Sequence, residues 1–113
     1  MAQAKYSGPP ERLEQYEELV ATVSGLERKG AANPYTSRNG WMQSFLDKDG
    51  SLSIRLGKED RETFLEKYDT DLAVQYGSVM KEFAVVPDRL LDTDELTDWF
   101  VRSYEWVGTL EPK

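Results

Sequence analysis

The stretch Asn33–Leu56, NPYTSRNGWMQSFLDKDGSLSIRL, decides the fold of this 113-residue chain. Within it, Asn39-Gly40 separates two extended runs, and Asn-Gly is the strongest short signal for a β-hairpin because both residues adopt positive φ. A second turn at Asp47–Gly50 leads into a run in which every second residue is apolar: Leu52, Ile54 and Leu56. The stretch therefore predicts three antiparallel strands in a meander, the third with one buried face.

A helix is expected before the meander. Pro9-Pro10 opens it, because proline suits the first helical turn, and an apolar stripe at steps of three and four runs from Leu13 to Leu26. Arg28-Lys29 matches the negative end of the helix dipole, and Gly30 is a suitable C-cap. Gly25 marks a point at which the helix kinks or ends early.

After the meander, the sequence predicts a helix, two strands and a last helix. The second helix is expected over Lys58–Tyr68, and the strands over Leu72–Tyr76 and Val79–Val86, joined by a turn at Gly77-Ser78. Asp92 is expected to cap the last helix, with Glu95 three residues later as in a capping box, and Gly108 to end it.

The predicted order of elements is α-β-β-β-α-β-β-α. Strands joined by hairpins cannot form a doubly wound parallel sheet, so we expect an α+β fold. In this fold one antiparallel sheet of about five strands packs against three helices as a two-layer sandwich. Residues 1–8 are expected to form a flexible N-terminus, and residues 9–113 a single domain.

Composition excludes several kinds of chemistry. The chain has neither cysteine nor histidine, so it has no thiolate nucleophile, no Ser-His or Cys-His pair and no zinc site of the usual nitrogen and sulfur type. The net charge of −7 opposes direct contact with nucleic acid or anionic membrane. No apolar run reaches the length of a membrane span, and the lack of disulfides favours the cytoplasm. We expect no cofactor and no enzymatic activity.

The first hairpin provides the candidate interface. A two-residue turn would place Arg38 opposite Trp41 and Tyr35 opposite Ser44. Trp41 and Phe45 would then share one face of the sheet, and Tyr35, Met42 and Leu46 the other. One face must meet the helices. The other is covered by a second subunit, a ligand or another part of the chain, or is half exposed. Trp41, Phe45 and Tyr35 are the candidate interface residues of the hairpin.

Two basic residues are candidate polar anchors for a ligand. Lys81 would lie opposite Val74 and on the same face as Phe83, so it snorkels to solvent, is displaced by a bulge or has a function. Arg55 is expected to pair across strands with Glu82.

The acidic segments have simpler explanations. Asp47–Ser51 begins like a calcium-binding loop, but Leu52 and Lys58 occupy the places where glycine and glutamate are needed, so a plain turn is expected. The clusters Tyr68–Asp71 and Asp92–Glu95 lie at helix boundaries, which accounts for their acids without catalysis.

Four segments of the chain carry a family resemblance: Gly40–Phe45 with Leu52–Leu56, Lys58–Phe64, Tyr76–Phe83 with Val86-Pro87, and the tail Tyr104–Lys113. Together they resemble the N-terminal domain of the TfoX (Sxy) family of bacterial competence regulators. The family's glycine-rich start of the meander is replaced here by Asn33–Gly40, which indicates a side branch of stand-alone proteins. The resemblance covers residues 12–113 and implies a two-layer sandwich related to secretion chaperones; it implies no catalytic residues.

Two hypotheses follow. The first is a non-enzymatic interaction or regulatory domain that binds a protein partner, or a second copy of itself, through the sheet face with Trp41 and Phe45. The alternative is a small-molecule-binding protein or minor enzyme with a pocket between sheet and helices, in which Lys81, Arg55 or a tyrosine is the polar anchor.

Overall fold

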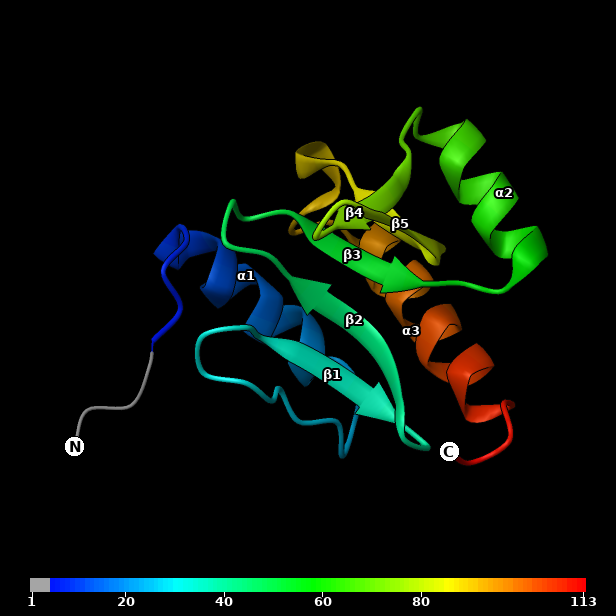
Figure 1. Cartoon of the computed structure of the whole chain (residues 1–113), viewed down its shortest axis with the longest axis horizontal. Helices are drawn as coiled ribbons and strands as arrows, with labels where there is room; N and C mark the ends of the chain where they lie inside the picture. Colours follow the sequence, from blue (N-terminus) through cyan, green and yellow to red (C-terminus); the bar gives the residue numbers. More distant parts are fainter. Residues whose placement is uncertain (1–4) are drawn as a thin grey trace.

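A computed structural model describes residues 5–113 and has the predicted α+β architecture (Figure 1). Three helices and five strands follow one another in the expected order α-β-β-β-α-β-β-α, with one short 3₁₀ turn before the last helix. The elements are α1 (Pro10–Ala21), β1 (Tyr35–Arg38), β2 (Trp41–Leu46), β3 (Leu52–Arg55), α2 (Lys58–Lys67), β4 (Leu72–Gln75), β5 (Ser78–Val86), η1 (Asp88–Leu90) and α3 (Asp94–Gly108).

The five strands form one antiparallel sheet in the order β1-β2-β3-β5-β4. β1, β2 and β3 are the predicted meander, and β5 adds to the free side of β3, with Ile54 opposite Ala84. The ladder between β4 and β5 shifts abruptly, because Leu72 pairs with Ala84 whereas Ala73 pairs with Met80. The chain of β5 between Met80 and Ala84 has no regular partner in β4, so the tip of this hairpin departs from the plane of the sheet.

The main core lies between the sheet and the helices. Figure 1 shows α1 and α3 behind the sheet, and their apolar stripes pack against the strand residues that alternate toward them. The stripe of α3 contributes Leu96 and Phe100, and α1 contributes Tyr16, Leu19 and Val20. Phe64 of α2 joins the same core and meets Trp99 of α3 edge to face at 5.3 Å between ring centres.

Three local predictions were wrong. α1 ends at Ala21, and Gly25 with φ of +83° lies in the irregular segment that follows, so the longer stripe overestimated the helix. Thr93, not Asp92, caps α3 by accepting a hydrogen bond from the backbone N–H of Leu96 at 3.2 Å. The turn of the second hairpin is Tyr76-Gly77, since Gln75 pairs with Ser78.

Two regional predictions concern the chain's start and its relation to membranes. Residues 1–4 of the predicted N-terminal segment lie outside the described residues, and within Lys5–Gly8 the hydroxyl of Tyr6 donates to the carbonyl of Asp47 at 2.5 Å. Between Lys5 and Lys113, none of the helices has the length and apolar character needed to cross a membrane.

Candidate functional site

One extra residue in β2 changes the predicted faces of the first hairpin. Arg38 pairs with Trp41 as predicted, but Thr36 pairs with Ser44 and Ser37 with Met42, which leaves Gln43 as a β-bulge. Tyr35 consequently lies opposite Phe45 and not opposite Ser44. The prediction that Phe45 shares a face with Trp41, and Tyr35 with Leu46, was wrong beyond the bulge.

The bulge turns two consecutive polar side chains toward the helices. Gln43 and Ser44 are both fully buried, although neighbours in a regular strand point to opposite faces. Gln43 reaches Ser103 of α3, and Ser44 reaches Tyr16 of α1, at 2.9 Å and 2.6 Å respectively. The first hairpin is thereby joined to both helices that cover the sheet.

These side chains belong to one continuous chain of buried hydrogen bonds. The Oε1 atom of Gln43 can only accept, so the hydroxyl of Thr36 donates to it at 2.5 Å. Thr36 must then accept from Ser44, and Ser44 from the hydroxyl of Tyr16. At the other end, Gln43 Nε2 donates to Ser103, whose hydroxyl donates to the carbonyl of Arg55 at 2.6 Å. Burial raises the pKa of Tyr16 to about 12.

Trp41, a predicted interface residue, is covered by the C-terminal segment. Its indole N–H donates to the carbonyl of Glu111 at 2.8 Å, and the ammonium of Lys113 lies 4.5 Å from the centre of one of its rings. The N–H of Lys113 donates to Asn39 in the turn, also at 2.8 Å. Trp41 and Phe45 therefore do not form a joint exposed surface.

The two predicted polar anchors occupy different surroundings. Arg55 pairs with Glu82 at 2.8 Å, which confirms the expected cross-strand pair, and its guanidinium lies 4.7 Å from the ring centre of Phe83. Burial lowers the pKa of Arg55, and its Nε has no hydrogen-bond partner. Lys81 is exposed, in the part of β5 where the ladder is irregular, and does not pair with Val74 as predicted, since Val74 faces Val79.

The sheet face away from the helices carries a second, smaller core. Phe45 and Phe83 meet there with ring centres 5.3 Å apart, and Ala73 of β4 is buried beside them. Met42, Met80 and Tyr35 pack around these three residues and are partly buried. The β4–β5 hairpin therefore covers the face around Phe45, so of the alternatives that the sequence left open, another part of the chain covers it.

A groove remains between this hairpin and the first one. It has a volume of about 760 Å³, and its apolar lining includes Tyr35, Met42, Phe45, Val74 and Met80. We call this groove, with those five residues as its apolar wall, the inter-hairpin groove.

The polar end of the inter-hairpin groove is formed by the turn between β2 and β3. Asp47 Oδ1 accepts from the backbone N–H groups of Asp49 and Ser51 at 2.9 Å, and Gln75 Nε2 reaches Asp47 Oδ2 at 3.5 Å. The Asp47 carboxylate is thus engaged within the protein, as expected of a plain turn and not of a calcium loop.

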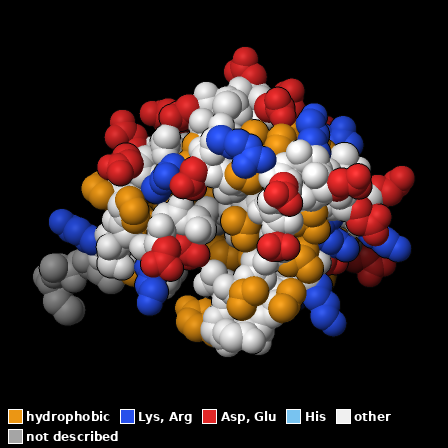
Figure 2. Space-filling view, turned by 90° about the horizontal axis from the view of Figure 1, so that it is seen from above, with side chains coloured by type: hydrophobic (Ala, Val, Ile, Leu, Met, Phe, Trp, Pro, Cys, Tyr) orange, Lys and Arg blue, Asp and Glu red, His pale blue; other side chains and the backbone are white. Residues whose placement is uncertain are grey.

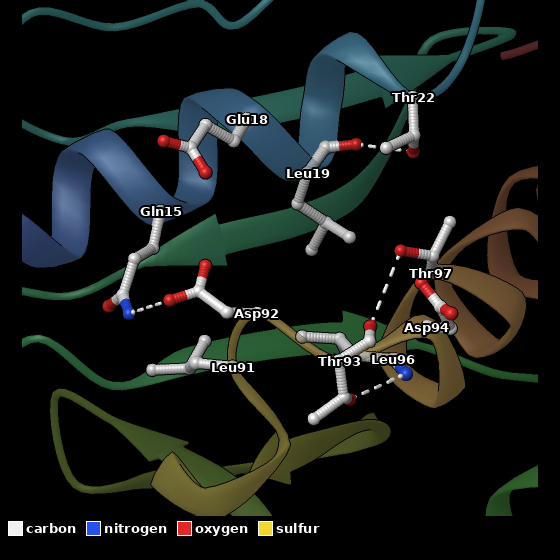
Figure 3. Close-up of a pocket in the computed structure, with 10 residues that line it drawn as sticks. All are labelled: Gln15, Glu18, Leu19, Thr22, Leu91, Asp92, Thr93, Asp94, Leu96 and Thr97. Carbon is white, nitrogen blue, oxygen red and sulfur yellow. Dashed lines mark hydrogen bonds between the residues drawn. The ribbon is translucent and has the colours of Figure 1, made fainter.

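A smaller hollow of about 290 Å³ lies between α1 and the start of α3 (Figure 3). Gln15, Glu18, Leu19 and Thr22 face it from α1, and the segment around Thr93 closes the other side. The amide of Gln15 donates to Asp92 Oδ2 at 2.7 Å and so bridges the two sides. This hollow is the feature nearest to the predicted pocket between sheet and helices, and it contains neither Lys81 nor Arg55.

Neither metal geometry nor similarity assigns a function to these features. Among residues 5–113 there is no group of three or more acidic side chains placed to hold a metal ion. Comparisons of the chain with protein-family models, with curated proteins and with solved structures found no match. Membership of the TfoX N-terminal family therefore stays a prediction from the segments that resemble it.

Proposed function

We propose that this chain is a protein-interaction domain without catalytic chemistry, in which the inter-hairpin groove binds an apolar segment of another protein. The observation that carries the proposal is the groove itself, which is open to solvent and has an apolar wall contributed by both hairpins. Its two methionines are unbranched and polarisable, so they adapt to side chains of different shape. Such a wall suits an extended apolar segment.

The polar groups of the groove favour a protein segment over a small polar ligand. Small-molecule sites orient their ligands with a few convergent polar groups. Asp47 is one of the polar groups of the lining, with Asn33, Lys48, Asp49, Gln75 and Ser78, and both of its carboxylate oxygens already accept hydrogen bonds from the protein. Affinity in the groove would therefore come mainly from apolar contact and from the backbone of the bound segment.

The role in the cell is proposed on the same basis. A regulatory domain that acts through protein contacts agrees with the resemblance to the TfoX N-terminal domain, and the lack of cysteine favours the cytoplasm. The net charge of −7 makes direct contact with nucleic acid unfavourable. We expect the partner to supply apolar side chains together with a basic residue near Asp49, where the groove is acidic.

Methionine methyl groups provide the test, because two of the three methionines in the chain line the groove. The protein labelled with ¹³C-methyl methionine is titrated with peptides selected from a phage-displayed library. We expect the methyl signals of Met42 and Met80 to shift together. Binding should weaken at least about tenfold in Met42→Glu, and Thr63→Glu on exposed α2 is the matched control. Selected peptides that leave both methyl signals unmoved would refute the proposal.

Small-molecule binding is the second candidate, and one observation favours it. The groove volume of about 760 Å³ falls within the range of about 300–1,000 Å³ that is usual for ligand pockets. Native mass spectrometry of the protein, purified without denaturation, distinguishes the two candidates. A stoichiometric mass adduct that is lost in Met42→Glu would favour the small molecule; the bare chain mass would favour the protein segment.

A further inference from the structure

The large exposed hydrophobic residues of the described chain are confined to one hairpin. They are Val74, Tyr76 and Val79, with 57%, 97% and 55% of their surface exposed. Val74 and Val79 lie directly opposite each other in the β4–β5 ladder, and Tyr76 is at the turn. While Ala73 and Met80 pack against the sheet, Val74 and Val79 keep more than half of their surface in solvent, and Val74 also lines the inter-hairpin groove. Large hydrophobic side chains are not required on a surface that contacts only water.

The same hairpin is the place where two copies of this acidic chain can approach without repulsion. Leu72–Met80 is the longest run without a charged residue in a sequence whose net charge is −7. Figure 2 shows one face of the molecule, on which hydrophobic side chains gather in the lower middle, with charged side chains above them and to either side. A two-fold contact brings the same surface patch of both copies together, so a neutral patch meets a neutral patch whereas an acidic patch would meet an acidic one.

The two edges of the sheet differ in protection. At the β1 edge, Lys29 and Tyr35 exchange two backbone hydrogen bonds, at 2.8 and 2.9 Å, and the ammonium of Lys29 donates to Ser37. The β4 edge has β5 on one side, and Leu72–Gln75 contains no proline, lysine or other charge, the residues that commonly block edges. Gln75 and Ser78 flank a two-residue turn, so their backbone groups hydrogen-bond to each other. In an antiparallel pair the next residues along the strands do not hydrogen-bond across the pair. The backbone N–H and C=O of Val74 therefore point away from β5, to the open edge of the sheet.

We propose that a second copy of this chain docks on this edge, with the two β4 strands antiparallel and Val74 opposite Val74 of the partner subunit. In this register Ala73 lies opposite Gln75 of the partner subunit, and the turn with Tyr76 comes beside Leu72 of the partner subunit. The paired segments Leu72–Gln75 contain no charged residue, so no two carboxylates face each other across the ladder. The inference rests on the proposed function, since it assigns a partner to one wall of the same groove.

The size of the contact sets the expected affinity. Standard interfaces use about 20–30 residues on each side, and this hairpin offers fewer, so we expect a reversible dimer with a dissociation constant on the order of 100 μM. Analytical ultracentrifugation between about 10 μM and 1 mM should show a concentration-dependent rise in mass. Val74→Lys should weaken dimerisation at least about tenfold, and Thr63→Lys should leave it unchanged.

Crosslinking tests the register, because the chain has no cysteine of its own. Directly opposed residues in antiparallel strands have Cα atoms about 4.5–5.5 Å apart, within the range for a disulfide. Val74→Cys should therefore form covalent dimers under mild oxidation much faster than Thr63→Cys on α2, and circular dichroism checks that both variants are folded. Equal rates for the two variants, or a constant monomer mass at all concentrations, would overturn the dimer.

The outcome separates this inference from the function on which it rests. Peptide-induced shifts of the Met42 and Met80 signals in a chain that stays monomeric would overturn the dimer and leave the interaction domain. Absence of both peptide binding and crosslinking would overturn both. Crosslinking of Val74→Cys that a selected peptide abolishes would support both and would show that the two partners compete for the hairpin.

Discussion

The β1–β2 and β4–β5 hairpins have the same turn geometry but different surroundings. Asn39-Gly40 has φ values of +57° and +82°, and Tyr76-Gly77 has +53° and +77°. The first hairpin is fixed to both helices by buried hydrogen bonds and is covered at its tip by the C-terminal segment. The second has one apolar face on the sheet and another in solvent. Turn geometry alone therefore does not decide which hairpin is structural and which is available for binding.

The residues at the first turn position reflect this difference. Asparagine tolerates positive φ, and Asn39 also donates to the carbonyl of Gly108 at 3.1 Å, so its side chain serves the fold. Tyrosine is a poor choice for positive φ, yet Tyr76 is 97% exposed and contributes no packing within the chain. A residue that is unfavourable for its backbone conformation, and that makes no compensating contact inside the domain, is typical of a functional site.

The largest effect should come from removing the link between the first hairpin and the helices. Gln43→Leu leaves the buried hydroxyl of Thr36 without its acceptor and Ser103 without a donor, and we expect a loss of about 2–4 kcal/mol in the free energy of unfolding. Urea unfolding measures it. Gln75→Leu, the matched change in the second hairpin, removes one contact at 3.5 Å and should cost less than about 1 kcal/mol. Equal losses would contradict the contrast between the hairpins.

The second effect depends on pH. Tyr16 keeps its proton to about pH 12 in the folded chain, whereas an unfolded tyrosine loses its proton near pH 10. The folded state binds more protons in this interval, so stability falls as pH rises, by up to about 1.4 kcal/mol per pH unit from this group. Urea unfolding at pH 9, 10 and 11 should show a shallower fall in Tyr16→Phe.

Part of the fall should remain in that variant, because the pKa values of Tyr6 and Tyr68 are also raised, in both cases mainly by burial. An unchanged slope in Tyr16→Phe would show that the buried hydroxyl chain does not hold this proton.

A smaller effect is expected at the tip of the first hairpin. Deleting residues 111–113 removes the hydrogen bond from Trp41 to Glu111 and that from Lys113 to Asn39, and we expect a loss of about 1 kcal/mol. The indole N–H signal of Trp41 in a ¹⁵N–¹H spectrum, assigned with Trp41→Phe, should become exchangeable with solvent. A protected signal after the deletion would mean that the tail does not cover Trp41.

The smallest effect should come from the strained turn residue. Tyr76→Asn relieves the unfavourable φ and should raise the free energy of unfolding by about 0.5–1 kcal/mol, while it weakens self-association. The reverse exchange, Asn39→Tyr, should lower stability by more than this, because the bond to Gly108 is lost as well. Thermal unfolding of the two variants makes the comparison, and a destabilised Tyr76→Asn would argue that Tyr76 serves the fold.

The order of elements could be predicted because each carries its own local signal. The alternation of Leu52 and Ile54 and the Asn39-Gly40 turn depend on residues close in sequence, and the structure confirms both. The stripe of α3 was equally clear, although Thr93 and not Asp92 proved to be its cap. Such features follow from steric preference and periodicity, which act within a few residues.

The candidate site could not be predicted, because it depends on two irregularities in the sheet. A turn fixes register only as far as the next bulge, and nothing in the run Trp41–Leu46 indicated that Gln43 would be the extra residue. The shift between Leu72 and Ala73 likewise redirects the second hairpin onto the open face. A buried glutamine whose partners lie on β1 and α3 indicates a bulge only to a reader who already knows that those partners are close to it in space.

The bulge at Gln43 also changes the parity of β2. Before it, Met42 points to the face away from the helices, and after it so does Phe45, although the two are three positions apart and would point to opposite faces in a regular strand. The bulge therefore determines to which face each later side chain of β2 points. Gaining a single further residue here would exchange Phe45 and Leu46 between the two cores, whereas losing Gln43 would leave a regular ladder in which both residues keep their faces. This strand should consequently tolerate loss of the bulge residue better than a single-residue insertion.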